Sequence, residues 1–469
     1  MMQLRLGDEA DAKRLLDESF EIDPFNVRVS NSLKVLEVLD GYAVLETEHF
    51  VLKFDRGHDD ILARYASRYL EEEVYPTLVK RFGYAPSQKS LFEIFSRARN
   101  TDAHGWFSAR MVGLPYVSTV GACAGKMVAM TSPNELRKKF NWARVLKHEF
   151  VHVLNLQQTA FNVPHWFTEA LAVETEEYPR PQVWNELLRT RVPKGELFNL
   201  DTINLGFVRP ASSLDWQMAY CQAQLYAQYM LKTYGDDALA KMLAAYADNL
   251  ETKAALRRAF AVEQEAFEQG YRQYIEQVAA ELTPRDEAGE LGRQAAAKLQ
   301  EKQVDEAAEL YEQAARQEPQ NLQWSKRLAK LYLTSGNDDK LAEVLQRLAH
   351  ADPDDFVVRK KLAQLALAGG RFAEAARWCR AANQIDVLDS DVHRMWAEAL
   401  TAEKKFSEAI DEYEVAVRLD ADEAATRLGL AKAYLAAGES DKASAALKEL
   451  LKRSPDHAEA RQLLEKLDE

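Results

Sequence analysis

The chain has 469 residues, which is too long for one hydrophobic core and predicts two or three domains. With 47% hydrophobic and 29% charged residues, its composition excludes a largely disordered protein. The net charge of −14 argues against nucleic acid as a main partner, because phosphate binding requires basic patches.

The N-terminal segment, residues 1–42, is charged from its start and lacks the apolar core of a signal peptide. Its stretch GDEADAKRLLDESFEIDPFN looks like the second helix of a helical repeat whose first helix is missing. We therefore expect the remnant of a repeat array, in a chain cut from a longer precursor. No run of about 18 apolar residues occurs in the chain, so we expect no membrane span.

A central domain is expected over residues 43–284. The stretches HFVLKF and SLFEIF alternate apolar and polar residues, as strands do, and a helical pattern over residues 60–82 lies between them. GKMVAM, after the glycine-rich VGACAG, predicts a further short strand. From Trp142 onward the chain is mostly helical. This order of strands first and helices later predicts an α+β domain.

Two histidines four residues apart, His148 and His152, lie on the helix that is expected to begin near Asn141. This spacing turns both imidazoles to one face, close enough to share a metal ion, and Glu149 stands between them. The H-E-x-x-H arrangement is typical of zinc metallopeptidases, although it also occurs by chance on structural helices.

A zinc site of this kind needs a third protein ligand. The metzincin pattern would require Gly and His at positions that here hold Asn155 and Gln158, so that subclass is excluded. The stretch VPHWFTEALAVETE offers Glu169 instead. Enough residues separate Glu169 from His152 for the first helix to end, the chain to turn at Pro164, and a second helix to return the carboxylate.

H-E-F-V-H followed by P-H-W-F-T-E-A-L-A resembles the gluzincin peptidases of the peptidase MA-like type. The resemblance implies a thermolysin-like α+β zinc metallopeptidase domain in which His148, His152 and Glu169 bind Zn²⁺. It also implies that Glu149 is the general base that activates the metal-bound water. The family usually has Gly after the ligand glutamate, where this chain has Ala170.

Substrate contacts are implied by the same resemblance. The stretch VGACAGKMVAM is expected to pair with an extended substrate through backbone hydrogen bonds. The expected substrate-binding residues are Gly125, Met127, Val128 and Ala129. Gluzincin aminopeptidases carry an acidic residue in a comparable stretch, to hold the substrate amine. Residues 121–125 contain no acid, which favours an endopeptidase.

The stretch DWQMAYCQAQLYAQYMLKTYGDDALAKML resembles the helix that follows the ligand glutamate in this family. By that resemblance Tyr220 is a candidate hydrogen-bond donor to the oxyanion of the reaction, with a buried structural tyrosine as the alternative. His165 is a weaker candidate, for a substrate contact.

The C-terminal region, residues 285–469, contains an internal repeat. Pro319, Pro353 and Pro455 fall on a grid of 34 residues, with Val387 and Ala421 at its other points. Small or aliphatic residues recur twelve and five positions before each grid point: Ala307, Ala314, Leu341, Leu348, Ala375, Ala382, Ala409, Ala416, Ala443 and Leu450. This spacing resembles the tetratricopeptide (TPR) repeat and predicts an all-α solenoid of about five units, ending in a capping helix.

Together these features predict a zinc-dependent endopeptidase whose TPR groove recruits a protein substrate or partner. The alternative is an inactive metallopeptidase-fold scaffold in which the repeats do the work. Domains of this kind commonly accompany repeats in bacterial proteins. The compartment stays open between the cytoplasm and, if an upstream signal peptide was removed, the periplasm.

Overall fold

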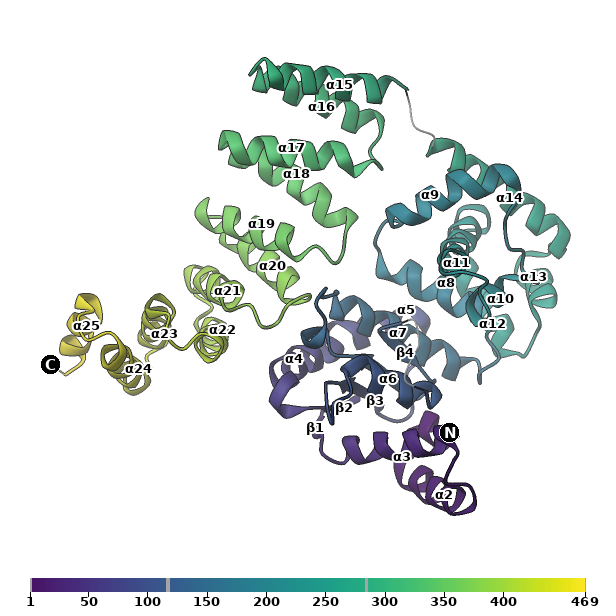
Figure 1. Ribbon diagram of the computed structural model, residues 1–469, viewed down its shortest axis with the longest axis horizontal. Coiled ribbons are helices and arrows are strands. Elements are labelled where there is room, and N and C mark those ends of the chain that lie inside the picture. Colours follow the sequence, from purple (N-terminus) through teal and green to yellow (C-terminus); the bar gives the residue numbers. More distant parts are fainter. Residues whose placement is uncertain (1, 115–118, 283–285, 469) are drawn as a thin grey trace. The chain divides into compact units, whose positions relative to one another are not determined.

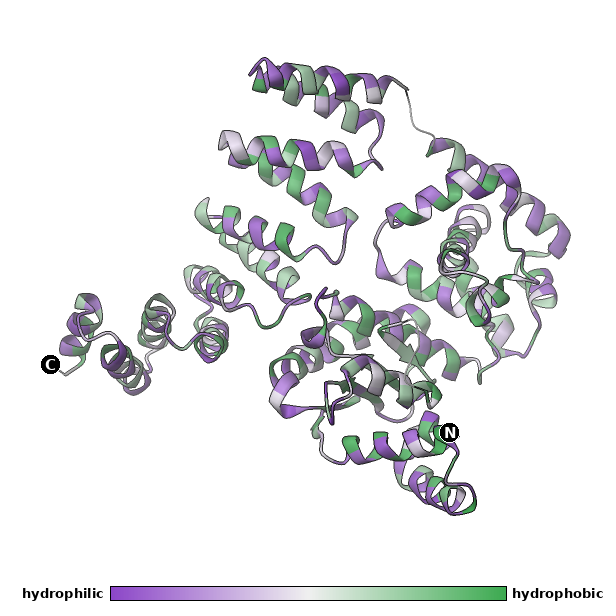
Figure 2. Ribbon diagram, in the orientation of Figure 1, coloured by the Kyte–Doolittle hydropathy of each residue, from purple (hydrophilic) through white to green (hydrophobic). Residues whose placement is uncertain are grey.

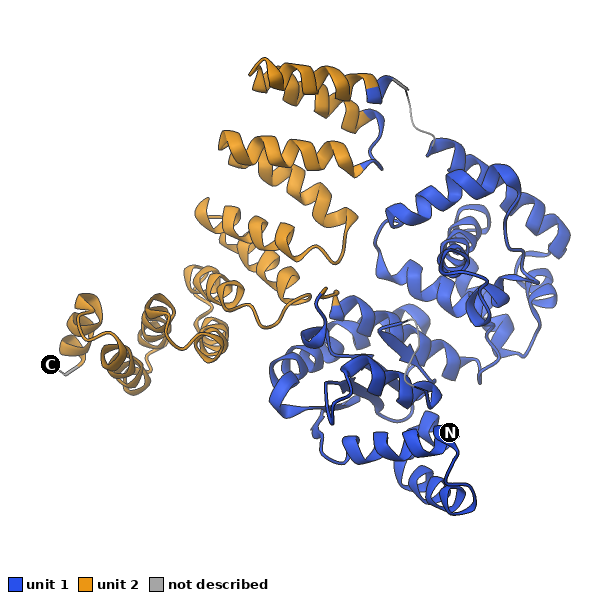
Figure 3. Cartoon of the chain, viewed as in Figure 1, with its two compact units in different colours: residues 1–137, 142–289, 317–321 blue, residues 138–141, 290–316, 322–469 orange. Residues whose placement is uncertain are grey.

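Figure 1 shows the computed structural model, which describes residues 2–114, 119–282 and 286–468. The chain divides into two compact units (Figure 3). Unit 1 comprises Met1–Arg137, Trp142–Gly289 and Gln317–Asn321, and unit 2 comprises Lys138–Asn141, Glu290–Arg316 and Leu322–Glu469. Among the described residues, no helix combines the length and apolarity needed to cross a bilayer. The expected domain boundary between residues 284 and 285 lies outside the described residues.

Unit 1 contains a five-stranded sheet with the strand order β1-β2-β3-β5-β4. Strands β2, β3 and β5 are parallel, and the two edge strands, β1 and β4, are antiparallel to their neighbours. Helices connect the parallel strands, as parallel pairing requires. The strands are β1 (Ala43–Glu46), β2 (Phe50–Phe54), β3 (Ser90–Phe95), β4 (Gly121–Cys123) and β5 (Met127–Thr131).

The sequence patterns locate three of these strands. HFVLKF forms β2, in which buried and half-buried residues alternate; SLFEIF forms β3 and GKMVAM forms β5, whose residues are all buried. The helix expected over residues 60–82 is present but broken into α4 (Arg56–Tyr69), a π-helical turn (Leu70–Val74) and α5 (Tyr75–Phe82). Pro76 lies in the first turn of α5, and because it has no N–H it cannot continue the regular hydrogen-bond ladder of the preceding helix.

Three N-terminal helices pack onto the sheet domain: α1 (Met2–Leu6), α2 (Glu9–Ile22) and α3 (Val27–Leu39). They form their own small core of Leu4, Ala12, Leu16, Val29 and Leu36. Helix α3 also lies against α6 (Ala103–Val112), and the Leu4 carbonyl accepts a hydrogen bond from Arg110 Nη2 (2.9 Å). The N-terminal segment therefore belongs to the same compact unit as the sheet; its origin as a repeat remnant stays a prediction.

The second half of unit 1 is helical, as expected from Trp142 onward. Helix α11 lies against α8, and its Tyr226 ring stacks on Tyr271 of α14 at 3.6 Å. The longer helices of this half are α7 (Trp142–Gln158), α8 (His165–Glu176), α9 (Gln182–Arg191), α10 (Ile203–Val208), α11 (Ser213–Tyr234), α12 (Ala238–Ala247), α13 (Thr252–Phe260) and α14 (Gln264–Glu281).

Unit 2 consists mainly of helices of 11 to 15 residues that follow one another through short turns. All ten small or aliphatic positions of the 34-residue pattern are buried. Figure 2 shows hydrophobic and hydrophilic residues alternating along these helices, as amphipathic packing requires. The helices are α15 (Asp286–Gln300), α16 (Val304–Gln317), α17 (Leu322–Ser335), α18 (Asp338–Ala351), α19 (Phe356–Ala368), α20 (Phe372–Asn383), α21 (Ser390–Ala402), α22 (Phe406–Leu419), α23 (Ala424–Ala436), α24 (Ser440–Arg453) and α25 (Ala458–Asp468).

A buried ion pair ties α6 to the sheet and generates a stability prediction. Arg110 donates to both carboxylate oxygens of Glu93, at 2.7 and 2.9 Å, and both side chains are fully buried. Arg110→Met leaves the Glu93 carboxylate buried without its partner, which we expect to cost about 3–5 kcal/mol of unfolding free energy. Denaturant unfolding of the full chain measures this loss.

Arg14→Met is the matched control, because it removes an exposed ion pair with Asp11 and Glu18. It should leave the unfolding free energy nearly unchanged, because solvent screens exposed charges. Equal losses for the two variants would contradict a structural role for the buried pair.

Candidate metal centre

Helix α7 holds His148, Glu149 and His152 toward the interior of unit 1. Its opposite side is anchored by buried apolar residues such as Phe150 and Leu154, so the rotation of the helix is fixed. The two imidazoles meet as the four-residue spacing predicts, with 3.1 Å between their Nε2 atoms.

Helix α8 brings Glu169 to these imidazoles. Between α7 and α8 the chain turns at Ala160 and Phe161, which both have positive φ, and α8 begins directly after Pro164. Glu169 Oε2 lies 3.3 Å from His148 Nε2 and 3.5 Å from His152 Nε2. The three residues thus form a group that could hold a metal ion, as expected from the sequence.

The geometry of this group fits a zinc ion. Tetrahedral ligands at about 2.0–2.1 Å from zinc lie roughly 3.3 Å from one another. The three separations, 3.1, 3.3 and 3.5 Å, bracket that value. Glu169 Oε2 is moreover buried and has no hydrogen-bond partner, which is costly unless a cation completes its environment.

The outward nitrogens of both histidines have hydrogen-bond partners that hold the rings in place. His148 Nδ1 donates to Glu176 Oε1 (2.7 Å), and Glu176 Oε2 accepts from Arg144 Nη1 (3.0 Å). His152 Nδ1 and Thr168 Oγ1 share a hydrogen bond (2.8 Å). In the neutral imidazoles that a metal ion would require, a proton on each Nδ1 would leave the Nε2 lone pairs facing the candidate metal position, the arrangement that metal-binding histidines usually have.

Glu176 and Thr168 were not among the site residues predicted from the sequence. Glu176 follows Glu169 by seven residues, which is two turns of α8 and places both carboxylates on one face. Thr168 directly precedes the ligand glutamate. The helical spacing from Glu169 was the signal that could have identified Glu176.

The second oxygen of Glu169 is held by two donors. Oε1 accepts from His165 Nε2 (3.0 Å) and from the Tyr220 hydroxyl (3.3 Å) of α11. The carboxylate is therefore oriented with Oε2 toward the imidazoles. Tyr220 and His165, the two further site residues predicted from the sequence, thus both lie at the candidate metal centre and both contact Glu169.

Glu149 lies beside the metal group, only 6% exposed. A Cβ on Gly121 would approach its Oε1 to 3.0 Å, so the glycine lets strand β4 pass close to this carboxylate. Burial raises the pKa of the Glu149 carboxyl; the imidazoles of His148 and His152 oppose the shift, and neighbouring carboxylates add to it.

A cavity of about 960 Å³ opens over the group. Glu149, His165 and Tyr220 line it together with the ligands, and β4 forms part of one wall. The remaining walls combine apolar residues (Leu156, Val163, Phe207, Pro210 and Trp216) with uncharged polar ones (Thr119, Thr168, Ser212, Ser213 and Gln217).

The structure corrects the expected substrate strand. Met127, Val128 and Ala129 are fully buried in β5, whose backbone pairs with β3 on one side and β4 on the other. Gly125 lies in the turn before β5, with φ +90° and its carbonyl bonded to Gln157 Nε2 (2.8 Å). None of the four lines the cavity among the described residues. The strand that does so is the edge strand β4 (Gly121–Cys123).

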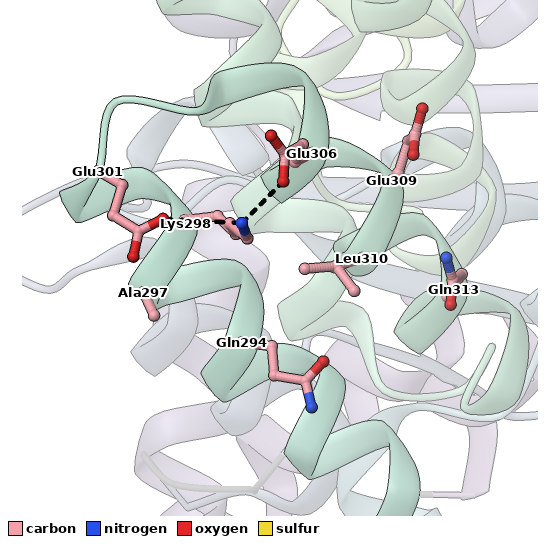
Figure 4. Close-up of a pocket in the computed structure, with 8 residues that line it drawn as sticks. All are labelled: Gln294, Ala297, Lys298, Glu301, Glu306, Glu309, Leu310 and Gln313. Atoms are coloured by element: carbon pink, nitrogen blue, oxygen red, sulfur yellow. Dashed lines mark ion pairs between the residues drawn. The ribbon is translucent and has the colours of Figure 1, made fainter.

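A second pocket, of about 470 Å³, lies between α15 and α16 of unit 2 (Figure 4). Its Lys298 is already paired with Glu306 (2.8 Å) and Glu301 (3.6 Å). The one lysine of the pocket is thus already engaged by the pocket's own carboxylates at an open surface, so the described lining shows no features of a specific site.

Unit 1 is thus an α+β unit in which one helix carries the H-E-x-x-H residues and the next helix supplies a glutamate to the same group. Residues 134–277 match the sequence model of the Peptidase MA superfamily, which confirms the resemblance. Residues 298–355 and 400–467 match that of the tetratricopeptide repeat. No curated protein matches the chain.

Several solved structures are similar to part of the chain. The crystal structure of MamA protein is 17% identical, with a TM-score of 0.31, over 37% of this chain and 95% of that one. YrrB, described as a TPR protein with an unusual peptide-binding site, is 14% identical, with a TM-score of 0.32, over 37% and 89%. MamA 41-end from Desulfovibrio magneticus RS-1 is 14% identical, with a TM-score of 0.30, over 38% and 99%.

The contact between His148 and Glu176 generates a prediction on metal affinity. Glu176→Gln removes the charge that fixes the His148 tautomer, and we expect the Zn²⁺ affinity to fall about 10- to 100-fold. Competition with a chromogenic chelator measures this affinity.

The neighbouring variant Glu177→Gln is the matched control. The Glu177 side chain is 71% exposed and contacts Lys147 rather than an imidazole. It should leave the Zn²⁺ affinity unchanged. An unchanged affinity for Glu176→Gln as well would show that the carboxylate does not support the metal ligand.

Proposed function

We propose that the chain is a zinc-dependent peptidase that hydrolyses peptide bonds, with His148, His152 and Glu169 as the metal ligands. The observation that carries the proposal is the convergence of these three ligand atoms beside Glu149 in one cavity. When bound, zinc would supply Lewis-acid chemistry, lowering the pKa of a water molecule and polarising the substrate carbonyl. The match to the Peptidase MA superfamily supports the same class of reaction.

Glu149 is proposed as the general base. Its carboxylate takes a proton from the attacking water as the new C–O bond forms, and returns that proton to the leaving nitrogen as the C–N bond breaks. Support comes from its place at the cavity wall, next to both imidazoles, and from its burial, which keeps competing solvent away.

Tyr220 is proposed as a donor to the oxyanion that develops on the substrate carbonyl. Its hydroxyl lines the cavity and lies within reach of the metal group, since it bonds to Glu169 Oε1. Its ring is held between Phe207 and Trp216, at centroid distances of 4.9 and 4.8 Å, so the hydroxyl has a defined position.

The charges that line the cavity favour an endopeptidase. An exopeptidase must pair the substrate's terminal amine or carboxylate with an opposite charge. The described lining residues include neither Lys nor Arg, and their carboxylates are those of Glu149 and Glu169. Strand β4 offers an open edge along which an extended internal segment could pair. The repeats are proposed to recruit a protein substrate or partner.

The general-base proposal is tested with Glu149→Gln. The amide cannot accept the proton, so we expect cleavage of a protein substrate to fall about 10²- to 10⁴-fold. Both the variant and the wild type should contain about one zinc ion per chain. Equal cleavage by both would contradict the mechanism. A wild type that binds zinc but cuts nothing would favour the inactive scaffold.

Tyr220→Phe separates two roles of the hydroxyl. If it stabilises the oxyanion, kcat falls about 10²- to 10³-fold while KM and Zn²⁺ affinity stay nearly constant, which is the result we expect. A fall in Zn²⁺ affinity with little change in kcat would instead assign Tyr220 to the orientation of Glu169.

A further inference from the structure

We propose that Gln157 and Phe161 are positioning residues of the peptidase. They hold the turn between β4 and β5 against the end of α7, and so fix the distance from the edge strand β4 to the metal group. This inference rests on the proposed function, and neither residue belongs to the described lining of the cavity. It is carried by two close approaches of β4 to α7, one at each end of the strand.

The first approach is at Gly121, where β4 begins. A Cβ on this residue would lie 2.7 Å from Val145 Cγ1 and 3.0 Å from Glu149 Oε1, both on α7. Glycine therefore lets the strand pass close to the proposed general base. This contact fixes the start of β4 but gives the other end of the strand no support from the helix.

The second approach is at Gly125, in the turn between β4 and β5. Its carbonyl accepts a hydrogen bond from Gln157 Nε2 (2.8 Å), and a Cβ on it would lie 2.3 Å from Phe161 Cε1. The Phe161 ring thus lies directly on the glycine backbone. Because Gly125 also has φ +90°, both the backbone conformation and the available space exclude a side chain here.

The two contacts match in spacing. From Glu149 to Gln157 the helix rises about 12 Å, at about 1.5 Å per residue. From Gly121 to Gly125 an extended chain covers at most about 13 Å, at about 3.3 Å per residue. The strand therefore runs alongside the helix and is attached to it at both ends. Cys123, between the two glycines, lines the cavity.

The turn that carries Phe161 has a conformation that favours glycine. Ala160 and Phe161 have φ +48° and +67°, in the left-handed region. The Phe161 N–H donates to the Leu156 carbonyl (2.7 Å), as in a common cap of helix C-termini. Glycine would adopt this conformation without strain. What phenylalanine adds is its ring, which is 51% exposed and contacts Gly125.

The position of β4 matters for the proposed reaction because an extended substrate would pair along this strand. The backbone hydrogen bonds of that pairing would set where the scissile carbonyl lies relative to Glu149 and the metal ligands. A displacement of about 1 Å at a reacting centre costs up to about 10²-fold in rate. Loosening the strand at Gly125 should therefore lower activity without any change in the metal group.

Two variants test this role. Gln157→Met replaces the amide by a side chain of similar size and helix propensity that cannot donate to Gly125. Phe161→Gly removes the ring and relieves the backbone strain of the turn. The probe is a quenched fluorogenic peptide that spans a site cut by the wild type in the oxidised B chain of insulin. With the zinc-loaded full chain, we expect kcat/KM to fall about 10- to 100-fold in each variant, with Zn²⁺ affinity unchanged.

Gln158→Met is the matched control for Gln157→Met. Gln158 also donates through Nε2 to a backbone carbonyl, but to that of Phe82 at the end of α5 (3.0 Å). This variant makes the same chemical change one residue along the helix and should keep the wild-type kcat/KM. An equal loss in the control, or no loss in Gln157→Met and Phe161→Gly, would overturn the inference.

Backbone esters in the peptide separate positioning from a general loss of structure. Replacing one amide by an ester, with the scissile amide intact, removes a single N–H donor. Where that N–H pairs with β4, the wild type should lose about 2- to 10-fold in kcat/KM. Gln157→Met should lose much less, because its strand is already displaced. Equal losses in both proteins, or no loss at any position in the wild type, would overturn the inference and leave the peptidase function intact.

Hydrogen exchange tests the contacts at Gly125 without a substrate. In Phe161→Gly, the amides of residues 121–124 should exchange at least about fivefold faster than in the wild type, because the strand has lost support at its end. The other edge strand, β1, is the internal reference and should exchange as before.

Failure of the underlying function gives a different result. A zinc-loaded wild type that cuts no peptide would remove the peptidase proposal, and with it the role of Gln157 and Phe161 in substrate positioning. Unchanged exchange in β4 of a chain that does cut would overturn the positioning role alone.

Discussion

The candidate site depends on one buried carboxylate, that of Glu169, being kept ionised in the interior. Burial favours its protonated form, but without a metal ion the positive charge of the protonated His152 and His148 imidazoles outweighs this effect and holds the pKa of the carboxyl well below the usual range. The surrounding contacts divide between its two oxygens. One oxygen is satisfied by His165 and Tyr220, while the other points at the imidazoles without a hydrogen bond. This asymmetry is what a cation at the centre would require.

The position of Glu169 is in turn fixed by packing behind α8. Trp166 and Phe167 are fully buried, and their rings contact Tyr226 of α11 and Tyr246 of α12 at 5.4 and 5.2 Å. Helix α8 is thus enclosed on nearly all sides, which is why its sequence shows little separation into apolar and polar faces. Such packing resists the small displacements to which metal sites are sensitive.

The metal group was predictable from sequence, since a spacing of four residues turns two imidazoles to one face. The third ligand followed from a family resemblance. The strands β2, β3 and β5 were found through alternation or apolar runs. The order of the strands in the sheet could not be predicted. A short continuous apolar run such as that of β5 indicates that a strand is buried, but it does not indicate which strands pair with it. The sequence therefore led us to predict that the apolar stretch of β5 binds the substrate. In the structure, the glycine-rich β4 is the strand that lies at the edge of the sheet.

The substitution of alanine for the usual glycine after the ligand glutamate is accommodated by the fold. Ala170 lies fully buried within the α8 helix, and its methyl group is enclosed by the helical core rather than placed in the cavity lining. In a helix interior, alanine is favoured over glycine by about 0.5–1 kcal/mol, because glycine loses more backbone freedom on folding. The substitution therefore makes the segment that carries Glu169 more rigid, and it leaves the contacts of both carboxylate oxygens in place.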